Sequence, residues 1–211
     1  MKGLILKDIL NLKSYLKIFA LILLANAAIF IPQGDSSFMA GFPVLISTML
    51  VITTMSYDDM AKWDKYALTM PLTRKEIVLS KYFVMVGFSV AGAITGLLLS
   101  IGSSFIIKEV AVIDTLSTVG VVLSIALIFG SVILPLLYKF GVEKARLMII
   151  LCALVPTGVV VLFSQVFKNS GMPVPSEALI KNILLMISIV SVIAVIVSFF
   201  FSLKIYSNKD F

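Results

Sequence analysis

The sequence predicts an all-α, polytopic membrane protein with six transmembrane helices. Apolar residues make up 60% of the 211 residues and charged residues only 13%, a balance typical of chains whose solvent is lipid. A helix needs about 20 mainly apolar residues to cross the hydrocarbon, and runs of this kind occur six times. We therefore expect a single transmembrane domain over residues 1–211, with spans near 17–34, 38–57, 78–107, 115–138, 147–168 and 180–203.

Residues 1–16 precede the first span and predict an interfacial helix. Apolar side chains recur at helical spacing, and Lys7, Asn11 and Ser14 project from the opposite side. The apolar positions are Ile5, Ile9, Leu12 and Leu16. We expect this helix to lie along the inner leaflet, where lysines gain from anionic lipid, either as an anchor or as a docking element for a partner.

The distribution of Lys and Arg predicts the orientation. With the N-terminus inside, only Lys108, Lys168 and Lys181 of the 17 basic residues fall in outer loops. An excess of basic residues in inner loops is the usual signal for topology. We expect a multi-pass protein of the bacterial plasma membrane with both termini in the cytoplasm.

The loop between the second and third spans carries charges of both signs. Asp58 and Lys62 are spaced i, i+4, and Met60, Trp63 and Ala67 share one face, which predicts an amphipathic helix over 58–68. Pro71 ends this helix. Thr73 and Glu76 then fit a capping box, so the third span begins well inside the cytoplasm.

Small residues and prolines occur inside several of the expected spans. Gly92 and Gly96 form a GxxxG pattern, which permits close approach of two helix backbones, and we favour helix packing over substrate contact here. Pro135 and Pro156 predict kinks in the fourth and fifth spans.

Several function classes are excluded by missing residues. The chain has no histidine and one cysteine, Cys152, which removes the common nucleophile pairs and most zinc sites, so we expect no catalytic residues and no metal site. No ionisable residue lies in the centre of a span, as an ion-coupled carrier would need. No GxxxxGK[ST] phosphate loop is present, and the basic residues flank apolar runs rather than forming a nucleic-acid patch.

The order of these features resembles a known family. The N-terminal MKGLILKDILNLKSYLK, the loop DDMAKWDKYALTMPLTRKEIVLSKY and the tail FSLKIYSNKDF are similar to those of type-2 ABC-exporter permeases of Gram-positive bacteria. The resemblance covers nearly the whole chain and is strongest over 63–81.

The resemblance implies a partner and a docking site. It implies a cytoplasmic ABC ATPase, which binds ATP and Mg²⁺ in place of this chain, and a second permease subunit, identical or different. The helix over 58–68 would then be the coupling helix seated in the ATPase. The expected docking residues are Asp58, Asp59, Lys62, Trp63, Lys65 and Tyr66, with the aromatic rings as anchors. The alternative is a helix that only lies on lipid headgroups.

The resemblance also suggests a substrate. Small permeases with this loop resemble those of phenol-soluble modulin exporters and of bacitracin or lantibiotic resistance systems. Export of amphipathic or antimicrobial peptides by alternating access is therefore the expected function. The alternatives left open are an ATP-independent channel or transporter and a non-transporting membrane immunity or assembly protein.

Overall fold

The structure is a computed structural model that describes residues 1–33, 36–67, 69–104, 112–169 and 177–209. The described residues form helices and turns, with no strand among them. The helices are α1 (Lys2–Asn11), α2 (Lys13–Phe30), α3 (Ser36–Met60), α4 (Trp63–Ala67), α5 (Arg74–Ser104), α6 (Val112–Asn169) and α7 (Glu177–Ser207).

Four helical segments are long and apolar enough to cross a membrane, or five if the bent pair α1 and α2 counts as one span. The four are Ser37–Met60, Arg74–Ser103, Thr115–Ala145 and Asn182–Ser207. The all-α, multi-span class is thus confirmed, and the count of six stays a prediction. Most side chains of the expected fifth span, 147–168, lie outside the described residues, as do residue 34 and residues 105–107 at the ends of two other expected spans.

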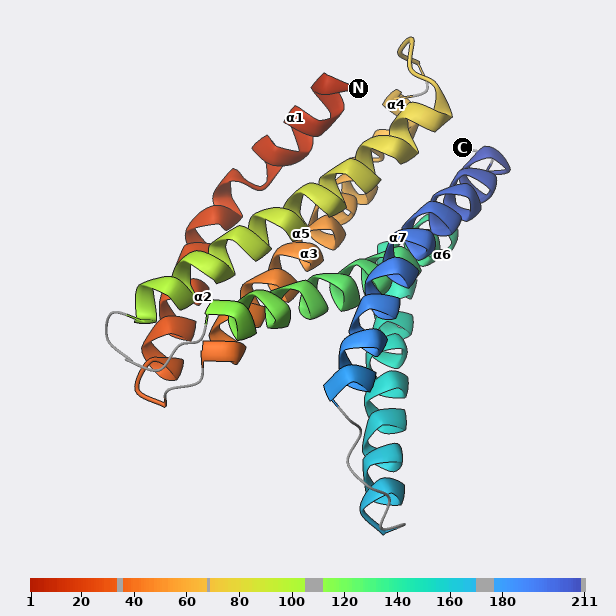
Figure 1. Cartoon of the computed structure of the whole chain (residues 1–211). Helices are drawn as coiled ribbons and strands as arrows, with labels where there is room; N and C mark the ends of the chain where they lie inside the picture. The colour runs from red at the N-terminus through yellow and green to blue at the C-terminus, as the bar shows by residue number, and fades with distance from the viewer. Residues whose placement is uncertain (34–35, 68, 105–111, 170–176, 210–211) are drawn as a thin grey trace.

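Two groups of helices pack together. α3 packs against α5 and α6, and α6 packs against α7. The N-terminus, α4 and the C-terminus gather at one end of the molecule (Figure 1), which we call the α4 end. The larger hydrophobic core lies near this end and includes Val78, Met85, Leu134, Leu137 and Tyr206.

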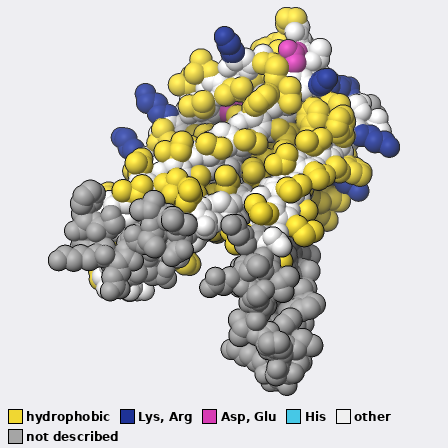
Figure 2. All heavy atoms as spheres, viewed as in Figure 1, with side chains coloured by type: hydrophobic (Ala, Val, Ile, Leu, Met, Phe, Trp, Pro, Cys, Tyr) yellow, Lys and Arg dark blue, Asp and Glu magenta, His cyan; other side chains and the backbone are white. Residues whose placement is uncertain are grey.

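Hydrophobic side chains cover the middle of the molecule, and the visible Lys and Arg side chains lie mainly around the α4 end (Figure 2). The apolar cover is most complete on α7, where Leu185, Ile189, Ile193 and Phe200 are all more than half exposed. Exposed apolar area of this extent is unfavourable in water and suits contact with lipid or another membrane helix.

The N-terminal helix ends earlier than expected. α1 stops at Asn11, and Leu12 separates it from α2, which begins at Lys13 rather than near 17. The two helices differ in direction by 62°. Leu12 is buried, so its packing fixes the bend between α1 and α2. The apolar spacing in the sequence continues through Leu12 and therefore did not predict this bend.

The helix expected over 58–68 is divided in the structure. α3 continues through Asp58 to Met60, Lys62 adopts a left-handed conformation (φ 48°), and α4 begins at Trp63. Leu68 lies outside the described residues. Asp58 extends α3 because its carboxylate pairs with lysines of two neighbouring helices, a tertiary contact that overrides the local pattern.

The break between the fourth and fifth expected spans falls at Gly141. Helical structure runs from Val112 to Asn169 with one non-helical residue, Gly141 (φ 73°, ψ 168°). The two halves of α6 point in different directions on either side of it (Figure 1). Pro135, where a kink was expected, lies six residues before the break. This positive φ is readily adopted only by glycine, which explains why the chain turns there.

Candidate functional site

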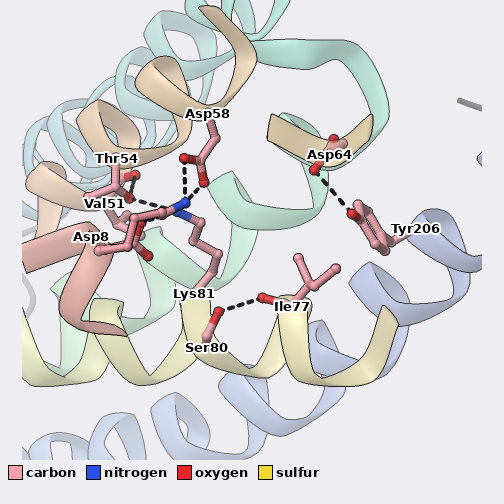
Figure 3. Close-up of polar contacts among 10 residues, drawn as sticks. Asp8, Val51, Thr54, Asp58, Asp64, Ile77, Ser80, Lys81 and Tyr206 are labelled. Atoms are coloured by element: carbon pink, nitrogen blue, oxygen red, sulfur yellow. Dashed lines mark hydrogen bonds and ion pairs between the residues drawn. The ribbon is translucent and has the colours of Figure 1, made fainter. Parts of the chain in front are cut away.

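Four charged side chains meet at the α4 end and form a cluster, which we call the charge cluster. Lys7 and Asp8 come from α1, Asp58 from α3 and Lys81 from α5. Lys81 Nζ lies 2.8 Å from Asp8 Oδ1 and 2.7 Å from Asp58 Oδ2 (Figure 3). Lys7 Nζ lies 2.6 Å from Asp58 Oδ1 and 3.3 Å from Asp8 Oδ1. The cluster thereby joins three helices.

Burial makes these ion pairs depend on one another. The side chains of Asp8, Lys81 and Asp58 are only 1%, 5% and 12% exposed. Desolvating charges costs free energy that the pairing must offset, so removing one partner leaves an uncompensated buried charge. One oxygen, Asp8 Oδ2, has no hydrogen-bond partner among the described residues. The cluster is therefore sensitive to the loss of any member.

The charge cluster also reaches α4. The Lys7 ammonium lies 4.4 Å from the centroid of the Trp63 ring, a cation–π geometry. Trp63 packs at the edge of the larger core. α1 therefore contacts both α3 and α4 through the same lysine.

Asp59, next to Asp58, contacts a different helix. Its Oδ2 atom accepts a hydrogen bond of 2.8 Å from the backbone N–H of Val142, the first residue after the break in α6. A helix start leaves backbone N–H groups without partners, and a carboxylate there both accepts a hydrogen bond and favours the positive end of the helix dipole. Asp59 thus caps the second half of α6.

Asp64 of α4 contacts the end of α7. The hydroxyl of Tyr206 donates a hydrogen bond of 3.1 Å to Asp64 Oδ1 (Figure 3). Lys209 Nζ lies 4.0 Å from Oδ2 of the same carboxylate. Burial raises the pKa of the Asp64 carboxyl above its usual value, although the Tyr206 hydroxyl and Lys209 oppose this. The nearby carboxylates of Asp59 and Asp58 add to the rise.

The same end of α7 is held by α5. The guanidinium of Arg74 donates hydrogen bonds to the backbone carbonyls of Tyr206, Ser207 and Lys209. A cation at a helix C-terminus satisfies carbonyls that lack helical partners and complements the dipole. At the start of α5, the Thr73 N–H donates to Glu76 Oε2 (2.9 Å) and the Glu76 N–H to Thr73 Oγ1 (3.3 Å), which confirms the capping box.

The expected docking residues divide into two groups. Asp58 is held in the charge cluster and Trp63 is half-buried beneath Lys7. Asp59, Lys62, Lys65 and Tyr66 are exposed, with Tyr66 62% exposed, and Asp59 uses one oxygen within the chain. Contacts with a partner can therefore involve the second group, whereas Asp58 and Trp63 contact other helices of this chain.

The residues expected on the membrane-interface face are divided in the structure, and their contact with lipid stays a prediction. Leu12 is buried and Ile5 half-buried, but Ile9 and Leu16, also expected on the apolar face, are exposed. The buried face consists of Leu4, Asp8 and Leu12, and Lys7 points to Asp58 rather than to solvent. The hydrophobic pattern could not predict that Asp8 is buried, because aspartate is a polar residue and its partner Lys81 lies far away in the sequence.

Gly92 and Gly96 lie where α5 meets α3. A Cβ atom at Gly92 would lie 2.7 Å from the Pro43 carbonyl oxygen, and one at Gly96 would overlap the carbonyl oxygen of Ala40. Only hydrogen fits at these positions. The two glycines therefore allow the backbones of α3 and α5 to approach closely.

Lys81, Asp8 and the Asp64–Tyr206 pair had no assigned role from the sequence. From the sequence alone, Lys81 is one of the basic residues expected on the inner side and serves only as a topology signal. The available signal was Asp8 on the lysine-rich N-terminal helix together with Lys81 inside the third helix, because buried charges require partners of opposite sign.

Comparison with known families identifies the whole chain. The family described as ABC-2 family transporter protein matches residues 3–207, which includes every residue of the charge cluster, helices α2 to α7 and all of α1 except Lys2. Comparisons with curated proteins and with solved structures gave no significant match. A match over nearly the full length shows that the chain belongs to the ABC-2 family of transporter proteins.

Proposed function

We propose that this permease exports amphipathic or antimicrobial peptides by alternating access, driven by a cytoplasmic ATPase that binds near α4. Membership of the ABC-2 family makes the chain the membrane-spanning component of an ABC exporter and implies an ABC ATPase partner. The ATPase would hold ATP and Mg²⁺, and a second permease subunit would complete the pathway. The α4 end would face the cytoplasm.

The contacts made by residues 58–64 support the proposal that the ATPase moves the membrane helices through this segment. Asp58 binds Lys7 of α1 and Lys81 of α5, Asp59 binds the start of the second half of α6, and Asp64 binds the end of α7. One short segment thus contacts four other helices. A force on the exposed side of this segment would reach the membrane helices directly, and alternating access requires such a link between two states.

The exposed side of the segment offers a surface for docking. Met60, Lys62, Lys65, Tyr66 and Met70 are all exposed. Apolar and aromatic side chains flanked by lysines have the composition of a protein–protein contact, in which Tyr is a frequent anchor. The complementary ATPase surface would be apolar with acidic residues around it.

A co-purification experiment tests the docking surface. The Lys65→Glu, Tyr66→Ala double variant should lose most of the co-purified ATPase, because one substitution reverses a charge and the other removes an anchor. Lys2→Glu, which changes an exposed lysine at the same end of the molecule, is the matched control and should retain the complex. Unchanged complex yield with the double variant, in a stably folded permease, would refute docking at α4.

The character of the helix contacts supports an amphipathic peptide as substrate. Where polar side chains meet between α3, α5, α6 and α7 in the described residues, most are hydroxyls, such as Thr48 with Ser89 and Ser124 with Ser188. A highly charged solute would find little charge compensation along such helices. An amphipathic peptide can keep its apolar face against protein or lipid.

Reconstituted ATP turnover tests the substrate class. An amphipathic helical peptide should stimulate ATP hydrolysis by the permease–ATPase complex in proteoliposomes. A peptide of identical composition with its apolar residues dispersed around the helix should stimulate it much less. Equal stimulation by both peptides, or by neither, would contradict the proposed substrate.

A further inference from the structure

The break in α6 at Gly141 has the geometry of a hinge between two helical segments. Gly141 has φ 73° and ψ 168°, and helical structure resumes at Val142. Because a residue with a Cβ atom is strained at this φ, the chain can hold this turn at Gly141 but not at its neighbours without cost. The second half of α6 therefore begins at a fixed point next to the end of α3.

One side chain holds the resumed helix to α3. Asp59 Oδ2 accepts the Val142 N–H at 2.8 Å, and no ion pair joins Asp59 to a basic residue of the described chain. Asp58, one residue earlier, is held by two lysines in a buried site. Asp59 is exposed, so its single hydrogen bond competes with water and is weaker than the contacts of Asp58.

Little empty space lies at the junction beside Asp59. A cavity of about 20 Å³, with room for about one water molecule, lies between α3, α4, α5 and α6 and is lined by Asp59, Asp64, Lys81 and Tyr138 among others. Close packing opposes displacement of one element against its neighbour, so a movement of the α3–α4 turn is passed on to the resumed helix.

We propose that Asp59 is the positioning residue that transmits movement of the α3–α4 turn to the second half of α6, with Gly141 as the hinge. The proposal rests on the proposed function, since the ATPase supplies the movement. Asp58 keeps the turn attached to α1 and α5, while Asp59 carries the resumed helix with it. The contact is local, so it can be measured in the permease alone.

Hydrogen exchange in the isolated permease tests the contact. Asp59→Ala removes the acceptor, and exchange of the Val142 amide and its neighbours should accelerate roughly five- to thirty-fold, the factor that corresponds to the usual loss of an N-cap. Asp59→Asn keeps an acceptor oxygen and should stay within about twofold of the unsubstituted protein, because Asn and Asp are similar caps. Glu143→Ala, which removes an exposed carboxylate from the same corner, is the control.

A distance measurement in the complex tests the transmission. Spin labels are placed at Ala61→Cys and Lys144→Cys, both exposed positions, after the single native cysteine, Cys152, is replaced by alanine. With Asp59 present, the distance between the labels should stay the same with and without a non-hydrolysable ATP analogue. With Asp59→Ala it should broaden and change with nucleotide, while Asp59→Asn restores the narrow distribution.

The two experiments separate this inference from the function on which it rests. Exchange at Val142 that is equally slow in Asp59→Ala and Glu143→Ala would overturn the role of Asp59, whatever the ATPase does. A label distance that follows nucleotide equally in the unsubstituted and Asp59→Ala proteins would also overturn it. Loss of ATPase binding in the Lys65→Glu, Tyr66→Ala variant, with exchange at Val142 still slow in that variant because Asp59 is intact, is the result expected if both proposals hold.

Discussion

The two sides of the molecule are held together by different chemistry. At the α4 end, buried ion pairs join α1, α3 and α5. Along its length α7 is joined to α5 and α6 through hydroxyls, whereas its C-terminal end is contacted by the Arg74 guanidinium and by Asp64. Tyr82 of α5, for example, shares hydrogen bonds with Ser198 and Ser202 of α7 at 2.6 and 2.8 Å.

This difference has an energetic consequence. Breaking one member of a buried ion pair typically costs about 3–5 kcal/mol, whereas a hydrogen bond between membrane helices averages about 0.6 kcal/mol. The α1–α3–α5 side should therefore behave as a unit, and α7 should rearrange against it at lower cost. The following predictions compare the two sides.

The largest effect is expected from Lys81→Met. The substitution keeps much of the side-chain volume but removes one of the two lysines that Asp8 and Asp58 share. Lys7 alone then compensates two buried carboxylates, and the protein should be destabilised by about 3–5 kcal/mol. Thermal unfolding in detergent measures the change. Lys75→Met alters an exposed lysine of the same helix and should cost less than about 0.5 kcal/mol. Equal effects for the two variants would show that the charge cluster contributes little.

The next effect concerns packing on the same side. Gly96→Ala places a methyl group against the Ala40 carbonyl of α3 and should destabilise the protein by about 1–3 kcal/mol. Gly87→Ala, in the same helix with open space around the new Cβ atom, should instead be neutral or stabilising by up to about 1 kcal/mol. Unfolding in detergent that ranks the two variants in the opposite order would rule out close packing of α3 on α5.

A smaller effect is expected on the α7 side. Tyr82→Phe removes the hydroxyl bonded to Ser198 and Ser202, and the expected cost is about 0.6 kcal/mol. Tyr66→Phe changes an exposed tyrosine and serves as the reference. If Tyr82→Phe lowered the free energy of unfolding as much as Lys81→Met does, the two sides of the molecule would not differ in the strength of their contacts.

The smallest effect is a pH dependence from Asp64. Its pKa is raised above the ordinary value of 3.8 because burial disfavours the charged form. The folded state therefore binds the proton more readily than the unfolded state, so stability rises as pH falls from the raised pKa to below 3.8. Asp64→Asn should lack this contribution. Unfolding curves of both proteins between neutral and acidic pH that run parallel would contradict the raised pKa.

The sequence predicted the helical class and most helix positions, because long apolar runs depend only on composition along the chain. The capping box was also predictable, since Thr73 and Glu76 are three residues apart and act locally. The pairing of Lys81 with Asp8 and Asp58 was not, because residues 73 and 23 positions apart meet only after the helices pack.

The helix breaks were harder to predict. The prediction placed kinks at prolines, but the α6 break occurs at Gly141, where a capping carboxylate from α3 satisfies the resumed helix. The helix expected over 58–68 was divided for a similar reason, since contacts of Asp58 extend α3 to Met60. In both cases a tertiary contact decided the boundary, and no local pattern contains that information.

The most direct test of the account is the accessibility of α4 in cells. A Lys65→Cys variant in the Cys152→Ala background is treated with a membrane-impermeant thiol reagent. The account predicts labelling only after the cells are opened, and protection when the ATPase is bound. Labelling in intact cells would place α4 on the outer surface and contradict the proposed role of this end.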